Sequence, residues 1–471
     1  MTLPRREFLH VAAGAAAIAT LAESAIPTGA QAQLPAKGVL PQRSARDRLE
    51  EALARIADPN GEGARACLTV YAEEARHAAD AADARRRFGH ELGPLDGRIV
   101  TIKDLFDVKG EATRGGSKIR ANFAPANEDA AIVKRLRQAG AVIVAKTNMT
   151  EFAFSAMGIN PHYGTPGNPA DRKRVPGGSS SGAAVAAADG MCDIAIGTDT
   201  GGSCRIPASF CGLVGYKPSA RLVPRDGALA LSYTLDSIGP LAQSLADCSL
   251  THGVLVGEEP HAPTSMSPAG LRLGILTGPL LDDLDDTVGR SFEASCKRLS
   301  AAGARVTEFR TKLLGEMQEA NAKGGFSAPE ALDVHGAYFE THAKDFDHRV
   351  WQRIAPARQM GAAAYVSLMR ERQRLIGALD AELAQFDAVI LPTTPNVAPV
   401  IADTNASDEA FFAQNTRGLR NTAFANFFDL CAISLPTPTG GLPAGLQLAA
   451  RNGADRSLFA HAAAVESTLR A

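Results

Sequence analysis

Short apolar runs alternate with longer amphipathic segments along most of the chain. Residues 42–57 place alanine, leucine and isoleucine on one face of a helix, and Asp-Pro-Asn-Gly at residues 58–61 predicts a turn after it. Residues 98–104 form a β-branched run that ends on Lys103 and predicts a buried strand. Further strands are predicted at residues 67–71, 141–145, 193–198, 271–276, 304–309, 388–391, 431–435 and 445–448, and helices at 72–87, 129–138, 182–188, 287–302 and over most of 312–384.

This alternation of short strands and helices predicts the fold class. Helices between successive apolar strands favour a layered α/β architecture. A chain of 471 residues could hold two or three average domains, but no internal repeat and no low-complexity linker divides it. We therefore expect one large domain with a mixed, mostly parallel central sheet covered by helices on both faces. Its functional loops are expected at the carboxyl ends of strands.

The N-terminal segment differs in character from the rest of the chain. Arg5 and Arg6 precede a mild apolar segment at residues 11–21, and Ala-Gln-Ala at residues 30–32 supplies small residues suited to cleavage. This pattern resembles a twin-arginine export signal; the alternative is an amphipathic helix or a weak membrane anchor. The apolar segment is too short to span a bilayer. We expect a signal peptide at residues 1–32, a mature domain at 33–471, a periplasmic location, and no stable membrane insertion after signal removal.

The charge balance argues against one broad class of partner. The chain has 49 Lys and Arg residues against 51 Asp and Glu residues, for a formal net charge of -2. No cluster of basic residues stands out, and phosphate backbones are bound by such clusters. Nucleic acid is therefore not an expected partner.

Histidine and cysteine spacing gives no sign of a metal site. The ten histidines form no H-E-x-x-H motif, the cysteines form no C-x-x-C pair, and the acidic residues 282–286 lack EF-hand spacing. Seven cysteines are too few for a disulfide scaffold in a chain of this length, and their odd number leaves at least one unpaired in a monomer. We expect neither a metal nor a cofactor.

Two glycine- and serine-rich clusters are the best candidates for chemistry. Residues 177–182 contain the G-x-S-x-G pattern of a nucleophile elbow, but the elbow needs a strand before it, and Asp-Arg-Lys-Arg-Val-Pro at residues 171–176 cannot form a buried strand. Residues 199–205, Asp-Thr-Gly-Gly-Ser-Cys-Arg, do follow a predicted strand. Glycines there allow successive backbone N–H groups to converge on one point, as an oxyanion hole requires. Without an evident histidine partner, serine chemistry needs another base, and Lys103 is available.

Together these features resemble the amidase signature family of serine hydrolases. The matching motifs begin with Lys103 in Ile-Lys-Asp and include both glycine-serine clusters in order. The resemblance as a whole covers roughly residue 49 to the C-terminus. It implies the amidase signature fold. The other matching segments are Gly-Tyr-Lys-Pro at 215–218, Asp-Ser-Ile-Gly-Pro at 236–240, Leu-Pro-Thr-Thr-Pro at 391–395 and Gly-Leu-Pro-Ala-Gly-Leu-Gln at 441–447.

The resemblance implies three catalytic residues. Ser203 is the nucleophile, Ser179 is the bridging serine that follows a cis peptide bond, and Lys103 is the base. To accept a proton, Lys103 must be neutral, so its pKa must fall from about 10.4 to near 7 through desolvation or a nearby like charge. The neighbouring Asp104 would oppose that shift, and we expect strand alternation to point it away from Lys103.

Further residues are expected to support these three. We expect Ser180 to hold Lys103 by hydrogen bonding, with helix capping by the serine run as an alternative that is compatible with this role. Asp199 and Arg205 are expected to pair and brace the loop. The backbone N–H groups of the oxyanion hole are those of Thr200, Gly201, Gly202 and Ser203.

The function implied is hydrolysis of a small-molecule carboxylic amide to an acid and an amine or ammonia through a serine acyl-enzyme. The alternatives are the glutaminase subunit of a tRNA-dependent amidotransferase, an esterase, and an inactive exported binding protein on the same scaffold. A homodimer would be compatible with the family. Cys204 departs from the aliphatic residue that often follows the nucleophile, and residues 151–162 and 328–372 are expected to set substrate choice.

Overall fold

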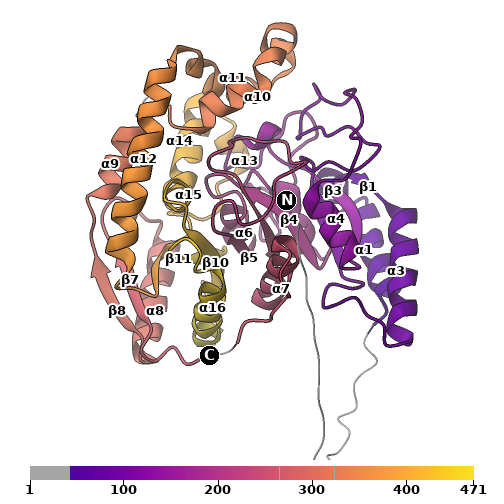
Figure 1. Ribbon diagram of the computed structural model, residues 1–471, viewed down its shortest axis with the longest axis horizontal. Coiled ribbons are helices and arrows are strands. Elements are labelled where there is room, and N and C mark those ends of the chain that lie inside the picture. The colour runs from indigo at the N-terminus through magenta and orange to yellow at the C-terminus, as the bar shows by residue number, and fades with distance from the viewer. Residues whose placement is uncertain (1–42, 265, 323, 471) are drawn as a thin grey trace, which may run out of the picture. The chain divides into compact units, whose positions relative to one another are not determined.

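The protein is described by a computed structural model over residues 43–264, 266–322 and 324–470. The predicted signal peptide lies outside these residues. They contain one eleven-stranded sheet with the strand order β1-β3-β2-β4-β6-β5-β10-β11-β9-β7-β8 (Figure 1). The strands are β1 (Cys67–Val70), β2 (Ile99–Lys103), β3 (Val142–Thr147), β4 (Ile194–Asp199), β5 (Val214–Lys217), β6 (Ser237–Ala242), β7 (Arg272–Leu276), β8 (Arg305–Phe309), β9 (Ala388–Pro392), β10 (Cys431–Thr437) and β11 (Ala444–Ala450).

The α/β class and the mixed sheet are confirmed, but the expected predominance of parallel pairing is wrong. Within the described residues, six of the ten strand pairings are antiparallel and four are parallel. The pattern missed β5 and β6, and β6 pairs antiparallel with both β4 and β5. Gly239 and Pro240 lie inside β6, and both residue types are depleted in strands. Because of these two residues, the sequence pattern predicted neither β6 nor the antiparallel pairing that β6 makes with its neighbours.

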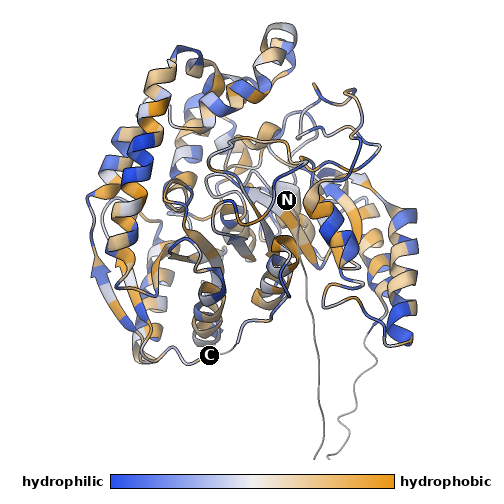
Figure 2. Cartoon of the chain, viewed as in Figure 1, coloured by the Kyte–Doolittle hydropathy of each residue, from blue (hydrophilic) through white to orange (hydrophobic). Residues whose placement is uncertain are grey.

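Successive side chains of the central strands enter two different cores. In β2, Ile99 packs into one apolar cluster, whereas Val100 and Ile102 pack into another. The first cluster is covered by the helices α1 (Ala45–Ala57), α3 (Ala72–Arg87), α5 (Ser181–Ala188) and α6 (Arg205–Cys211). The second is covered by α4 (Ala131–Gln138), α7 (Leu245–Val256), α8 (Asp286–Ala301) and α16 (Asp455–Arg470). Since a strand directs alternate residues to opposite faces, both faces of the sheet are covered by helices, as expected. Figure 2 shows the same pattern: the strands inside are largely hydrophobic, and the helices outside carry both hydrophobic and hydrophilic residues.

Several helices begin where the sequence provides a capping side chain. Ser44 accepts a hydrogen bond from the N–H of Asp47 and caps α1, whose buried stripe is the one predicted for residues 42–57. The helices of the first half are α1 (Ala45–Ala57), α2 (Gly63–Ala66), α3 (Ala72–Arg87), α4 (Ala131–Gln138), η1 (Glu151–Ala153), α5 (Ser181–Ala188), α6 (Arg205–Cys211) and α7 (Leu245–Val256).

The second half contains the helical region predicted for residues 312–384. There α9 and α12 pack against each other beside β7 and β8, and α10 and α11 lie above them in Figure 1. The helices are α8 (Asp286–Ala301), α9 (Leu313–Asn321), α10 (Ser327–His342), η2 (Ala343–Asp345), α11 (His348–Ile354), η3 (Ala355–Gln359), α12 (Ala362–Leu383), α13 (Ile401–Thr404), α14 (Asp408–Leu419), α15 (Ala423–Phe427) and α16 (Asp455–Arg470).

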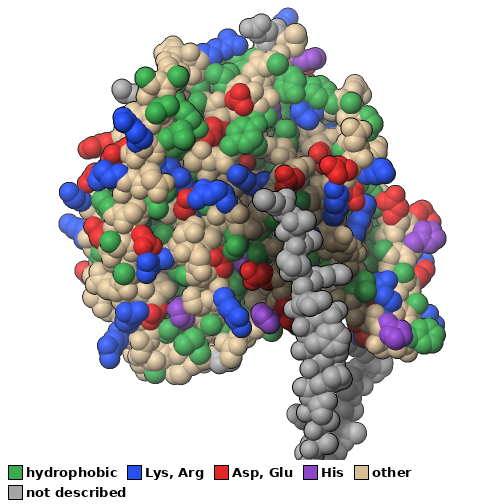
Figure 3. Space-filling model, in the orientation of Figure 1, with side chains coloured by type: hydrophobic (Ala, Val, Ile, Leu, Met, Phe, Trp, Pro, Cys, Tyr) green, Lys and Arg blue, Asp and Glu red, His purple; other side chains and the backbone are tan. Residues whose placement is uncertain are grey.

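The surface is mixed in charge. Figure 3 shows Lys and Arg side chains interspersed with Asp and Glu over the visible face. None of the described helices combines the length and the apolar content that a bilayer crossing requires.

Candidate active site

Lys103 is the last residue of β2 and is fully buried. Its Nζ lies 2.7 Å from Ser179 Oγ and 2.8 Å from Thr198 Oγ1. Burial lowers the pKa of Lys103 to about 8, although the nearby Cys204, Asp236 and Asp199 act in the opposite direction. A lysine with this pKa is neutral in an appreciable fraction of molecules near neutral pH, so it can accept a proton.

Asp104 does not counteract this shift. Its Oδ2 accepts a hydrogen bond from the N–H of Gly116, on the opposite side of the strand from the Lys103 side chain. Burial raises the pKa of Asp104 to about 6. The expected separation of the two neighbours is therefore present.

Ser179 is held by backbone geometry at the start of α5. The Gly178–Ser179 peptide bond is cis, as the resemblance implied. A Cβ atom on Gly178 would come within 2.5 Å of the Gly158 nitrogen, so no side chain fits there. The carbonyl of Ser179 accepts a hydrogen bond from the N–H of Thr150 at 3.1 Å. The Ser179 hydroxyl lies against Lys103 in this arrangement.

Ser180 does not hold Lys103 in the way that was expected. Its Oγ donates to the carbonyl oxygen of Thr198 at 3.3 Å, and Thr198 Oγ1 is the group that contacts Lys103. The capping alternative is not realised either, because no side-chain cap bond forms at Ser180. Ser180 reaches Lys103 only through Thr198, a residue that sequence reasoning missed because threonine is common in strands.

Ser203 lies in the glycine turn between β4 and α6. Its hydroxyl forms no hydrogen bond with any described residue, and it lines a cavity of about 610 Å³ together with Thr200 and Gly201. The next residue, Cys204, is close enough to Lys103 for the two side chains to shift each other's pKa. Lys103, Ser179 and Ser203 are thus brought into one region of the fold.

The turn presents unused hydrogen-bond donors. The backbone N–H groups of Thr200, Gly201, Gly202 and Ser203 donate to no acceptor among the described residues. Thr422 Oγ1 donates to the carbonyl oxygen of Gly201 at 2.6 Å. Because C=O and N–H point in opposite directions across a trans peptide, this bond fixes the direction of the Gly202 N–H. Gly202 has a φ of +136°, and a Cβ atom there would collide with Thr422. Free, fixed N–H groups suit a developing oxyanion.

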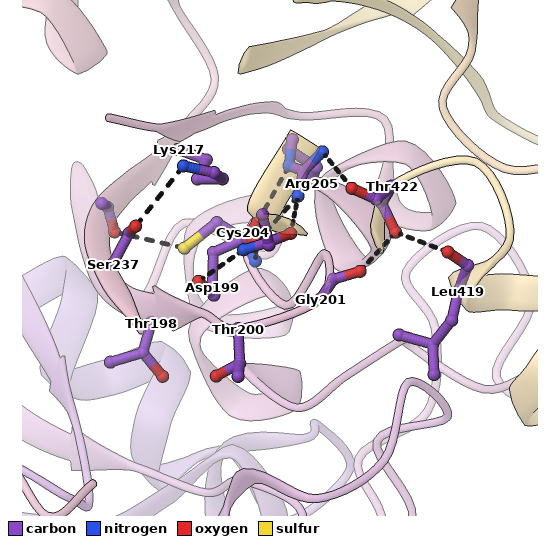
Figure 4. A network of polar contacts seen from close by, with 12 residues as sticks. Thr198, Asp199, Thr200, Gly201, Cys204, Arg205, Lys217, Ser237, Leu419 and Thr422 are labelled. Atoms are coloured by element: carbon purple, nitrogen blue, oxygen red, sulfur yellow. Dashed lines mark hydrogen bonds and ion pairs between the residues drawn. The ribbon is translucent and has the colours of Figure 1, made fainter. Parts of the chain in front are cut away.

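Asp199 and Arg205 form the expected pair, and both are fully buried. The guanidinium donates to both carboxylate oxygens of Asp199, at 2.9 and 3.0 Å. Burial by itself would raise the pKa of Asp199, but Arg205 outweighs it and holds the pKa at about 2. Asp199 also accepts from the N–H of Cys204 at 3.1 Å, which ties the ion pair to the turn (Figure 4).

Arg205 also connects the turn to residues near the C-terminal end of the sequence. Its remaining N–H groups donate to the carbonyl of Thr422 at 3.0 Å, to Gln447 Oε1 at 2.6 Å and to Asn426 Oδ1 at 2.7 Å. Gln447 belongs to a matched segment but had no predicted role, and Asn426 and Thr422 gave no sequence signal. Only the folded chain brings them to residues 199–205.

A second fully buried lysine, Lys217 in β5, lies next to this network. Its Nζ donates to the Pro218 carbonyl at 2.7 Å and lies 3.5 Å from Ser237 Oγ, and burial lowers its pKa to about 8. Asp199 acts in the opposite direction on that pKa. Figure 4 shows Lys217 on the far side of Asp199 from the Thr200 turn. Burial alone therefore does not select the candidate base; contact with Ser179 does.

A sequence model described as Amidase matches residues 47–459. The chain belongs to this family. Its relatives include 2-amino-5-chloromuconic acid deaminase of Comamonas testosteroni, 34% identical over 84% of this chain and 86% of the relative. One glutamyl-tRNA(Gln) amidotransferase subunit, from a Synechococcus species, is 33% identical over 86% of this chain and 90% of the relative.

A solved structure supports the same assignment. A crystal structure of an amidase has a TM-score of 0.81 and 34% identity, and the match covers 91% of this chain and 96% of that one. This member of the amidase signature family is therefore a hydrolase of carbon–nitrogen amide bonds.

Proposed function

We propose that the protein hydrolyses a small-molecule carboxylic amide through an acyl-enzyme on Ser203, with Ser179 and Lys103 as the proton relay. The observation that carries the proposal is the 2.7 Å contact between Lys103 Nζ and Ser179 Oγ in a fully buried site. A buried lysine with a lowered pKa needs a proton donor beside it in order to act as a base, and Ser179 is that donor.

The proposed reaction begins with neutral Lys103. It takes the Ser179 proton while Ser179 takes the proton of Ser203, and Ser203 Oγ attacks the amide carbonyl carbon. The N–H groups of the turn at Thr200 to Ser203 stabilise the oxyanion. When the carbon–nitrogen bond breaks, the proton returns through Ser179 to the leaving nitrogen. Water, deprotonated by the same relay, then releases the acid and regenerates Ser203.

The test is covalent labelling combined with turnover. We expect a fluorophosphonate probe to label Ser203 in the purified protein, and Ser203→Ala to lose both the label and all measurable amide hydrolysis while keeping its unfolding temperature. Ser467→Ala, on the exposed face of α16, is the matched control. Turnover that survives in pure Ser203→Ala protein would refute the proposal.

The alternatives give different outcomes in the same protein. A glutaminase component, which the similarity to the amidotransferase relative suggests, would copurify with partner proteins and prefer glutamine. An esterase would favour the ester in a matched ester and amide pair. An inactive binding protein on the same scaffold would leave Ser203 unlabelled by the probe.

We further propose that residues 1–32 direct export to the periplasm by the twin-arginine route. The support is the pattern of Arg5, Arg6 and the apolar segment after them. Arg5→Lys with Arg6→Lys is expected to retain the protein in the cytoplasmic fraction. Unchanged fractionation, or a native N-terminus that begins at Met1, would contradict this.

A further inference from the structure

The segment at residues 150–156 connects the candidate relay to the wall of the cavity. The N–H of Thr150 donates to the carbonyl oxygen of Ser179 at 3.1 Å, and the N–H of Gly178 donates to the carbonyl oxygen of Ala156 at 2.7 Å. Both ends of the segment therefore hold the chain at Ser179. Its middle residues line the cavity that contains the candidate nucleophile. The path of this segment thus decides where the Ser179 hydroxyl and one wall of the cavity lie.

The backbone of this segment is strained. Phe152 has a φ of 50° and Ala153 has a φ of 61°. Left-handed backbone is uncommon for residues other than glycine, and it persists at a bulky residue only where the surrounding structure holds it. Two such residues in succession therefore need external support. The side chain directly before them is that of Glu151.

Glu151 is fully buried and joins three separate stretches of the chain. Its Oε1 accepts a hydrogen bond from Ser117 Oγ at 2.7 Å and lies 2.8 Å from His162 Nε2. Its Oε2 accepts from the N–H of Asp347 at 2.7 Å. No Lys or Arg side chain among the described residues forms an ion pair with Glu151. Because burying a carboxylate without such a partner is costly, its retention here points to a role beyond packing.

The contact with Asp347 links the segment to the helices of the cavity wall. Asp347 is the N-cap of α11, and its side chain accepts a hydrogen bond from the N–H of Arg349 at 3.0 Å. The helix α11 lines the cavity through Gln352. Phe152 adds a contact with α10, because its ring stacks on that of His335 with 3.9 Å between the centroids. The strained segment is therefore fastened to both helices.

We propose that Glu151 is a positioning residue for the reaction: its carboxylate fixes the strained segment so that Ser179 meets Lys103, and it fastens the start of α11 to that segment. Among the described residues, Glu151 is not part of the cavity lining and forms no hydrogen bond with Lys103, Ser179 or Ser203. It therefore acts through the backbone. This inference rests on the proposed function of the site.

The first measurement is steady-state kinetics of Glu151→Gln. The substitution keeps the shape of the side chain, but the amide nitrogen cannot accept a hydrogen bond. We expect kcat to fall about 100-fold, because a displacement of about 1 Å in a catalytic group costs that much, and KM to change by less than about tenfold. The rate at which a fluorophosphonate probe labels Ser203 should fall in the same proportion as kcat.

Asp455→Asn is the matched control. Asp455 is also a buried carboxylate; it accepts hydrogen bonds from Tyr216 Oη and from the hydroxyl and N–H of Ser219, and His252 Nε2 lies 3.9 Å away. It has the same kinds of partner as Glu151, but none of these four described residues lines the cavity. Its substitution should leave kcat within about threefold of the wild-type value.

The second measurement reports the link to α11 and does not depend on turnover. Trp351 is the only tryptophan in the chain, and it lies on α11, whose start is held by Glu151. We expect Glu151→Gln to shift its emission to longer wavelength and to increase its quenching by acrylamide. Hydrogen exchange followed by mass spectrometry should become faster in the peptides that contain Thr150 and Asp347. Asp455→Asn should change neither signal.

Ser117→Ala is a milder variant that keeps the inference testable if Glu151→Gln folds poorly. It removes one of the donors to the carboxylate, and kcat should fall about tenfold. In the double variant the loss should be clearly smaller than the product of the two single losses, because both residues act through one contact. Independent losses that multiply in full would overturn the positioning role.

The outcomes separate this inference from the proposed function. An unchanged kcat in Glu151→Gln, or a loss no larger than that in Asp455→Asn, overturns the positioning role even where Ser203 is labelled. A loss of kcat without a change in emission or exchange overturns the link to α11. A wild-type Ser203 that the probe does not label refutes the proposed reaction instead. In that protein, faster exchange in Glu151→Gln would still support the link, and unchanged exchange would overturn it.

Discussion

The two sides of the candidate site are built in opposite ways. On the sheet side, Lys103, Ser179 and the turn at Thr200 to Ser203 come from three short segments, and each is fixed by bonds to buried neighbours. On the helical side, α9, α10, α11 and α15 supply the cavity wall through scattered residues such as Ala328, Arg353 and Phe427. In the reaction proposed above, the sheet side carries the chemistry, and the helical side faces the part of the substrate that does not react.

This difference predicts which substitutions the protein should tolerate. A buried polar group that loses its partner is costly, so changes on the sheet side should destroy activity or stability. Apolar residues of a cavity wall can exchange for others of similar size at small cost. We therefore expect substitutions to separate into large losses on one side and changes of selectivity on the other.

The largest expected effect is that of Lys103→Met. Removing the base should lower kcat by about 10⁴-fold or more, because the relay acts as a unit. The unfolding temperature should not fall, since a desolvated amine is replaced by an apolar side chain. Lys217→Met removes an equally buried lysine that does not contact Ser179, and it should lower kcat far less. Equal losses in the two variants, measured by steady-state kinetics, would contradict the assignment of Lys103 as base.

The next largest effect concerns the ion pair of Asp199 and Arg205 beside the turn. Asp199→Asn leaves Arg205 buried without its counter-charge, and it should lower the free energy of unfolding by about 3–5 kcal/mol. Urea denaturation followed by circular dichroism measures this. Glu371→Gln, which breaks an exposed pair with Arg374, should cost about 0–1 kcal/mol. If the two losses are similar, the buried pair does not stabilise the turn.

The smallest effect is on the pH profile. Since the base must be neutral, kcat/KM should rise about tenfold between pH 7 and pH 9, with an inflection at the Lys103 pKa of about 8. Thr198→Val removes an acceptor for the protonated amine, so it should move the inflection to lower pH. A flat profile, or an inflection that moves to higher pH in Thr198→Val, would contradict this role of Lys103.

The same contrast explains how much could be predicted from the sequence. Most strands, the helices α1, α3, α4, α5 and α8, and the helical region at residues 312–384 follow from local apolar patterns, and the contact of Lys103 with Ser179 was implied by the resemblance to the family. By contrast, β6 contains Gly239 and Pro240 and so gave no strand signal. The antiparallel pairing of β6, and therefore the predominance of antiparallel pairs in the sheet, was visible only in the structure.

Sequence reasoning also could not supply the partners that lie far away in the chain. Thr198, Thr422 and Asn426 are ordinary polar residues, and nothing local shows that they meet Lys103, Gly201 or Arg205. Residues 151–162 and 328–372 were expected to set substrate choice, and parts of both line the cavity.

The bonds from Arg205 to Thr422, Asn426 and Gln447 have a consequence for synthesis of the chain. Every residue of the proposed relay has left the ribosome before Thr422, Asn426 and Gln447 have been translated. Until they arrive, this guanidinium has no place to be buried, and the turn that it braces has no fixed form. We expect nascent chains to remain unreactive until the last strands dock, so that the appearance of the nucleophile reports completed folding.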